Sequence, residues 1–70
     1  MLSIALNLKK ARQAAGMTQE AVARKVGITQ VAYCRFELGT KLPTAMMMKA
    51  LADALEVPVG ELYADMPEVI

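Results

Sequence analysis

The sequence predicts an all-α protein, a compact bundle of five short helices that forms one domain over residues 1–70. Three observations lead to this fold class. Apolar residues recur at the three- and four-residue spacings that place side chains on one helical face. Threonines that can cap helix starts and glycines that can end helices separate these stretches. A chain of 70 residues has room for one hydrophobic core, and no segment of it is predicted as a strand.

The first helix is expected to begin after Ser3, its N-cap, and to run to about Ala15. Gly16 follows directly and is suited to ending it. Leu8, Ala11 and Ala15 are expected to face the core. This helix therefore supplies one wall of the interior.

The next two helices are expected at about residues 18–26 and 29–37, and they are too short and too close together to lie antiparallel. Thr18 and Thr29 are their N-cap candidates. Gly27 can adopt a left-handed conformation and lets the chain turn between them. Two such helices that cross steeply form a helix-turn-helix. The residues expected to set the angle between them are Val22, Ala23, Val26, Gly27, Ile28, Tyr33 and Phe36.

Two further helices complete the predicted bundle. Thr44 caps the fourth helix, which ends at about Leu55 or Glu56. Pro58 stands in the first turn of a short fifth helix that ends near residue 64. The consecutive residues Met46, Met47 and Met48 point in three different directions around the helix axis. At most two of their side chains can therefore lie in the core. The apolar faces of the two helices are expected to carry Met47 or Met48, Leu51, Ala52 and Leu55, followed by Val59, Leu62 and Tyr63.

The order and spacing of these residues resemble the DNA-binding domain of the phage Cro and lambda-type repressor group, the XRE family of bacterial regulators. The resemblance covers roughly residues 4–63, and its helix-turn-helix corresponds to residues 18–39, TQEAVARKVGITQVAYCRFELG. It implies a fold of lambda-repressor type whose third helix enters the major groove of double-stranded DNA. The residues that carry the resemblance are Arg12, Thr18-Gln19-Glu20, Val22-Ala23, Gly27-Ile28-Thr29-Gln30, Phe36-Glu37, Gly39, Pro43, Leu51-Ala52 and Leu55.

The resemblance also implies a buried ion pair between Arg12 and Glu37 that ties the first helix to the end of the third. Removing one partner of such a pair strands a buried charge. Two positions depart from the family pattern. Leu38 replaces the polar residue that is common before Gly39, and Glu56 stands where the family often has a helix-ending glycine.

The distribution of charge favours nucleic-acid binding more than the net charge of +1 does. Residues 1–42 hold seven Lys and Arg against two Glu, a net charge of +5, whereas residues 43–70 hold one Lys against five Asp and Glu, a net charge of −4. A basic end that faces phosphate and an acidic end that faces away are typical of a DNA-binding domain. Scattered solvated charge is the alternative interpretation.

Base contacts are expected from the outward face of the third helix. The Gln30 amide matches the N6/N7 edge of adenine, and Gln19 could hydrogen-bond Gln30 and hold that amide in one orientation. Arg35 can pair with guanine O6/N7 or reach a phosphate. Val31 can pack on a thymine methyl. Cys34 faces the same way as a small neutral filler or, alternatively, as a redox-sensitive thiol.

Phosphate contacts are expected at two places beside the motif. The start of the second helix offers backbone N–H groups and a favourable dipole at Thr18 and Gln19. The loop after the third helix offers Thr40, Lys41 and Thr44. These contacts would position the domain on DNA without reading its sequence.

The fourth and fifth helices and the residues after them carry more apolar surface than one small core needs, which predicts a homodimer. A dyad there would hold two recognition helices about one DNA turn (~34 Å) apart. Adaptable packing of the methionines in the core is the alternative interpretation. The expected interface residues are Met46, Val59, Leu62, Tyr63, Met66, Val69 and Ile70.

The function predicted from these features is that of a dimeric transcriptional regulator, a repressor of a short palindromic operator. The alternative is an antitoxin or another protein that binds a partner, such as a toxin, through its last helices and apolar tail. An enzyme is disfavoured because the chain has no histidine and one serine, and no metal-ligand or cofactor motif appears. The single cysteine and the lack of a signal peptide or membrane span fit a bacterial or phage-encoded protein of the cytoplasm that acts at the nucleoid.

Overall fold

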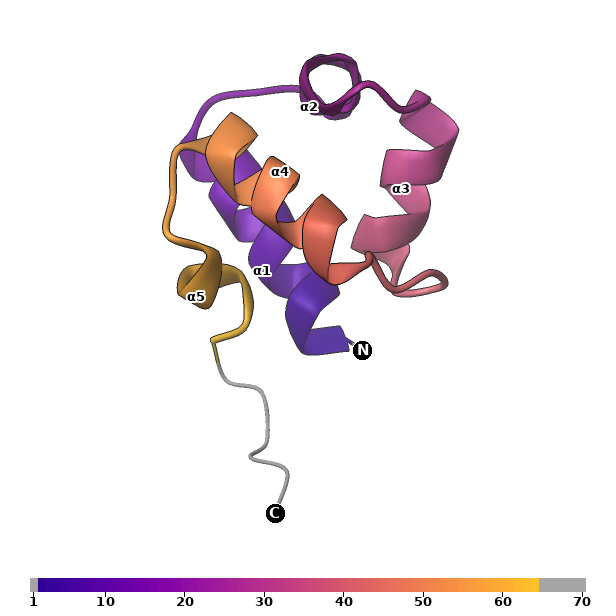
Figure 1. Ribbon diagram of the computed structural model, residues 1–70. Coiled ribbons are helices and arrows are strands. Elements are labelled where there is room, and N and C mark those ends of the chain that lie inside the picture. Colours follow the sequence, from indigo (N-terminus) through magenta and orange to yellow (C-terminus); the bar gives the residue numbers. More distant parts are fainter. Residues whose placement is uncertain (1, 65–70) are drawn as a thin grey trace.

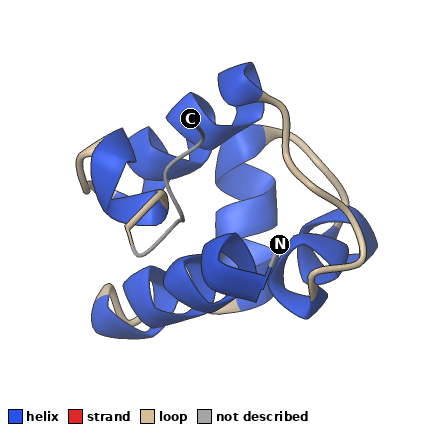
Figure 2. Cartoon of the chain, turned by 90° about the horizontal axis from the view of Figure 1, so that it is seen from below, coloured by secondary structure: helices blue, strands red, loops and turns tan. Residues whose placement is uncertain are grey.

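Five α-helices follow one another along residues 2–64, the part of the chain that the computed structural model describes. They are α1 (Leu2–Ala14), α2 (Gln19–Val26), α3 (Gln30–Leu38), α4 (Ala45–Leu55) and α5 (Val59–Leu62). Within these residues every element is a helix or a loop, as Figure 2 shows, so the predicted all-α class is confirmed. None of the five helices is long and apolar enough to cross a membrane.

The helices pack as a closed ring of neighbours around one interior. α1 contacts α3 and α5, while α2 contacts α3 and α4, and α4 also contacts α5. In Figure 1, α4 passes in front of α1, α2 is seen end-on, and α3 and α5 lie at opposite sides. This arrangement leaves the outer surface of α3 uncovered by the other helices.

The three predicted threonine caps are confirmed. The hydroxyl oxygens of Thr18, Thr29 and Thr44 precede α2, α3 and α4 and each accept a hydrogen bond from the backbone N–H three residues later. The distances from these oxygens to the nitrogens lie between 3.0 and 3.1 Å. Such bonds satisfy N–H groups that have no partner inside the helix, so these starts are encoded locally.

The ends of the first four helices share one backbone arrangement, in which a residue of positive φ reverses the chain. At the end of α4 this residue is Glu56 (φ 58°), and its N–H donates to Asp53 while that of Val57 donates to Ala52, at 3.2 and 3.0 Å. The helix therefore ends at Leu55, and Glu56 caps it although it is not a glycine. The other three residues are Gly16 (φ 68°), Gly27 (φ 78°) and Gly39 (φ 78°).

Three predicted helix boundaries differ from the structure, namely the start of α1 and both ends of α5. α1 already includes Leu2, so Ser3 lies inside the helix and is not its N-cap; the apolar residues Ile4 and Leu8, one turn apart, extend the buried stripe toward the start of the chain. Ala15 lies after α1 and is exposed. α5 is shorter than expected, and Pro58 precedes it as its N-cap.

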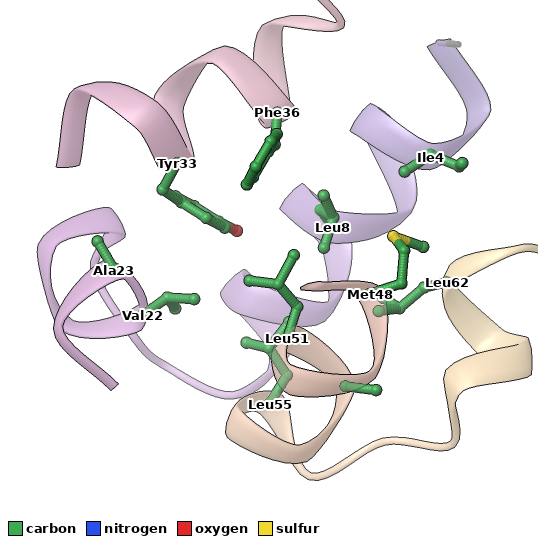
Figure 3. Close-up of a cluster of buried hydrophobic side chains, with 11 residues drawn as sticks. Ile4, Leu8, Val22, Ala23, Tyr33, Phe36, Met48, Leu51, Leu55 and Leu62 are labelled. Carbon is green, nitrogen blue, oxygen red and sulfur yellow. The ribbon is translucent and has the colours of Figure 1, made fainter. Parts of the chain in front are cut away.

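The hydrophobic core draws side chains from all five helices (Figure 3). Its centre contains Tyr33, whose ring meets that of Phe36 edge to face with centroids 6.4 Å apart. Of the methionine run, Met48 is fully buried, Met47 is half-buried and Met46 is 86% exposed, as the limit of two core residues requires. The buried cluster consists of Ile4, Leu8, Val22, Ala23, Tyr33, Phe36, Met48, Leu51, Ala52, Leu55 and Leu62.

Long-range hydrogen bonds from side chains hold helix ends against their neighbours. The Asn7 amide of α1 donates to the carbonyls of Leu62 and Ala64, at 3.1 and 2.7 Å. Lys25 Nζ of α2 donates to the Ala54 carbonyl of α4 at 3.3 Å. These three bonds satisfy carbonyls near the ends of helices, where intrahelical donors run out.

Candidate nucleic-acid interface

The turn between α2 and α3 places the two helices at a steep angle, as Figure 1 shows. Gly27 adopts its left-handed conformation, and the Ile28 N–H donates to the Ala23 carbonyl at 3.0 Å. Because Ala23 is buried and carries only a methyl group, the helices approach closely there. The residues expected to set this angle are buried, or half-buried against the core, except Gly27, which forms the turn: Val22, Ala23, Val26, Ile28, Tyr33 and Phe36.

The outward face of α3 forms one shallow depression together with the start of α2. Its lining includes all four residues expected to contact bases, and Val31 and Leu38 are 62% and 64% exposed within it. Gln30 and Arg35 are exposed, whereas Cys34 is half-buried. The lining consists of Gln19, Gln30, Val31, Cys34, Arg35 and Leu38. The fold therefore brings the sequence-predicted residues onto one accessible surface.

Arg35 is available to an external anion. It takes part in neither of the two salt bridges found within residues 2–64, which join Arg12 to Glu37 and Arg24 to Glu20. An exposed guanidinium presents five donors in a planar fork, which suits a guanine edge or a phosphate.

The expected phosphate-binding residues flank this depression along the chain. Thr18, Thr40, Lys41 and Thr44 are all exposed. The hydroxyl of Thr18 accepts a hydrogen bond as the cap of α2 and keeps its own proton for donation. The Thr40 hydroxyl donates to the Arg35 carbonyl at 3.3 Å, which fixes the loop against the end of α3.

Arg12 and Glu37 form a two-point ion pair inside the domain. Arg12 Nε lies 2.6 Å from Glu37 Oε2 and Nη2 lies 3.2 Å from Oε1, while Nη1 donates to the Met17 carbonyl at 3.0 Å. The side chains are 15% and 4% exposed. The hydrogen bonds that Arg12 donates to Glu37 raise the pKa of Arg12. Burial alone would raise the pKa of Glu37, but its hydrogen bonds outweigh burial and lower that pKa.

The Gln19 amide is bound by Glu37 and not by Gln30, so the expected hydrogen bond between the two glutamines is wrong. Gln19 Nε2 donates to Glu37 Oε1 at 3.0 Å. A charged carboxylate is a stronger acceptor than a neutral amide, which explains the choice. The sequence does not indicate this contact, because Glu37 lies 18 residues from Gln19 and the resemblance implies Arg12 alone as its partner. One signal could have indicated the contact: an ionised carboxylate such as that of Glu37 can accept more hydrogen bonds than one arginine donates, so a second donor was to be expected.

The residues expected at a dimer interface separate into three groups. Leu62 is fully buried in the core, where it packs with α1 and α4 residues, so its assignment to an interface is wrong. Val59 and Tyr63 are 41% and 39% exposed and line a groove between α4 and α5. Met46 is exposed but does not line this groove. Met66, Val69 and Ile70 lie outside the described residues.

Comparison with known proteins adds three findings. A family model described as helix-turn-helix matches residues 8–62. The cryptic phage CTXphi transcriptional repressor RstR of Vibrio cholerae is 36% identical over 61 residues, which cover 87% of this chain and 54% of that protein. An uncharacterized HTH-type transcriptional regulator of Bacillus subtilis, YqaE, is 38% identical over 56 residues, 80% of this chain and 48% of that protein. The chain thus spans about half the length of the curated relatives that it matches.

Proposed function

Because the chain belongs to the XRE-type helix-turn-helix family, we propose that it is a sequence-specific DNA-binding regulator of transcription that acts as a dimeric repressor on a short palindromic operator. One observation carries this proposal: four side chains suited to base contacts lie together on the exposed face of α3. A relative named as a transcriptional repressor supports the direction of regulation.

Base readout is assigned to the first turns of α3. Gln30, the first residue after the Thr29 cap, reads adenine through its amide. Arg35 reads guanine from the same depression, and Val31 contacts a thymine methyl. Cys34 fills the space between them without adding a charge. These roles require α3 to lie in the major groove, as the second helix of this motif does.

Phosphate binding is assigned to the two sites that flank α3. At the first site, the N-terminus of α2 presents backbone N–H groups beside Thr18 and Gln19, where the helix dipole attracts an anion. At the second, Thr40 and Lys41 follow α3 and Thr44 caps α4. The excess of basic residues in the first 42 positions adds a long-range attraction to the DNA.

Dimerisation is assigned to the surface of α4 and α5. The groove between these helices contains the apolar side chains of Val59 and Tyr63, with Lys49 and Asp53 beside them. In a two-fold dimer, one such patch meets its own copy, and oppositely charged residues within it can pair across the axis. Two recognition helices held in this way match a palindromic site.

The partner-binding alternative rests on the same exposed apolar side chains, above all Met46. In that case α4 and α5 hold a different protein, such as a toxin, and DNA binding is secondary. The stoichiometry of the complexes distinguishes the two functions. A dimeric regulator binds its operator as two protein chains per DNA site, whereas a partner-binding protein forms a complex that contains the other protein.

The deciding experiment is selection of bound DNA from a random pool, followed by a salt titration of binding to the enriched site. We expect a palindromic consensus and an affinity that falls steeply with salt, since each neutralised phosphate releases counterions. Lys41→Ala should flatten the salt dependence, whereas Lys10→Ala is the matched control, because Lys10 is an exposed lysine of α1 that lies beside α5 and outside both the depression and the proposed dimer groove. A pool that shows no enrichment would contradict sequence-specific recognition.

A further inference from the structure

The carboxylate of Glu37 connects the interior of the domain to the edge of the proposed DNA surface. On its inner side it is bound by Arg12 at two points, with 2.6 and 3.2 Å between nitrogen and oxygen atoms. On its outer side, Oε1 accepts from Gln19 Nε2 at 3.0 Å. Gln19 is half-buried and lines the depression with Gln30 and Arg35. One buried charge therefore contacts the recognition surface through a single side chain.

This contact determines which way the Gln19 amide faces. An ionised carboxylate only accepts hydrogen bonds, so the NH₂ end of the amide must point toward Glu37 and the carbonyl end cannot. Glu37 cannot turn away, because Arg12 holds both of its oxygens, and Arg12 is itself tied to the Met17 carbonyl at 3.0 Å. The Gln19 carbonyl oxygen and its second N–H remain free.

We propose that Glu37 is a positioning residue for DNA binding, which holds the Gln19 amide in one orientation so that its free N–H meets a phosphate without prior ordering. This inference rests on the proposed function. Ordering a glutamine side chain at an interface costs conformational entropy, and a side chain held before binding avoids that cost. The Arg12–Glu37 pair is complete without Gln19, so the third hydrogen bond is not needed to neutralise the buried charge.

The first test measures the mobility of the glutamine side chains in the free protein. ¹⁵N relaxation of the side-chain amides compares Gln19 with Gln13 and Gln30, which are exposed and have no side-chain hydrogen bond within residues 2–64. We expect the Gln19 amide to be nearly as rigid as the backbone and the other two to be mobile. A Gln19 amide as mobile as that of Gln13 would overturn the proposal, whatever the protein binds.

The second test measures operator affinity in a double-mutant cycle at a temperature where every variant is folded. The Arg12→Met and Glu37→Met pair replaces the ion pair by apolar side chains, an exchange that often preserves stability. It removes the acceptor for Gln19, so we expect about threefold to tenfold weaker binding, the fold-change that corresponds to ordering one glutamine side chain on binding. Gln19→Ala should weaken wild-type binding at least as much, and its effect should be smaller in the methionine background.

Arg12→Lys is the matched control for this cycle. It disturbs the same ion pair but leaves Glu37 charged and able to accept from Gln19, so binding should stay within about twofold of wild type. Additive effects of Gln19→Ala and the methionine pair would overturn the positioning role while leaving DNA binding intact. Wild-type protein that binds no selected DNA would instead overturn the proposed function itself.

Discussion

The hydroxyl of Tyr33 lies buried beside the carboxylate of Glu37, yet no hydrogen bond of good geometry joins them. Tyr33 has no exposed surface, and its oxygen has no hydrogen-bond partner within residues 2–64. Burial raises the pKa of Tyr33, and the hydrogen-bonding interaction with the Glu37 carboxylate and its negative charge raise it further. The hydroxyl thus stays neutral, and in place of water it has only a contact with Glu37 that falls short of hydrogen-bond geometry.

Tyr33→Phe should therefore stabilise the protein or leave its stability unchanged. The exchange removes an unpaired buried hydroxyl, whose desolvation costs about 1–3 kcal/mol, and keeps the ring that packs against Phe36. Urea unfolding followed by circular dichroism measures the change. A loss of more than about 1 kcal/mol would show that the hydroxyl has a partner in solution.

Removing one member of the buried ion pair should be far more damaging than removing both. Arg12→Met alone leaves Glu37 charged and buried, which should cost about 3–5 kcal/mol in the free energy of unfolding. Combining it with Glu37→Met should restore most of that loss. Arg24→Met, which disrupts an exposed pair with Glu20 at 3.8 Å, should cost less than about 1 kcal/mol.

Stability should fall in acid because the pKa of Glu37 is lower in the folded state than its ordinary value of 4.5. Below that value the unfolded chain binds a proton more readily than the folded one, so protons favour unfolding. The contribution is complete above pH 4.5 and is lost as the pH falls through the lower, folded value. Unfolding midpoints measured between pH 3 and pH 7 (roughly the range over which carboxylates titrate) test this loss of stability. In the double variant Arg12→Met and Glu37→Met, the midpoint should fall less steeply as the pH decreases.

A glycine at position 56 should stabilise the C-terminal end of α4. Glu56 occupies a left-handed conformation (φ 58°) that costs an L-residue about 1–2 kcal/mol, so Glu56→Gly should stabilise by up to about 1 kcal/mol after the entropy of glycine is subtracted. Gly27→Ala is the reverse control, because its added Cβ meets open space and only the backbone at φ 78° is strained. The midpoint temperature of thermal unfolding should rise for Glu56→Gly and fall for Gly27→Ala.

Base and phosphate contacts should respond differently to substitution. Arg35→Ala should cost about 1–3 kcal/mol on the selected operator and relax the preference at one base position. Lys41→Ala should weaken binding to every sequence alike. Binding assays against single-base operator variants separate the two effects, and an unchanged base preference for Arg35→Ala would remove it from the base-contact set.

The helix starts and ends could be predicted because their determinants are local. Thr18, Thr29 and Thr44 bind N–H groups three residues away, and Gly27 needs only its own backbone freedom. The start of α1 was missed because no cap residue marks it and the packing of Ile4 extends it. Local chemistry thus predicts most boundaries, and tertiary packing decides the rest.

The candidate surface was predictable because side chains three and four positions apart on α3 share one face whatever the rest of the fold does. The partner of Gln19 was not, since Glu37 and Gln19 meet only when α2 and α3 cross. Leu62 shows the same limit, because an apolar residue in a short helix fits an interface and a core equally well. By itself the sequence determined the helices, their caps and the face that α3 presents. The tertiary structure decided which buried groups pair with which, because those contacts depend on distances between helices that no local spacing encodes.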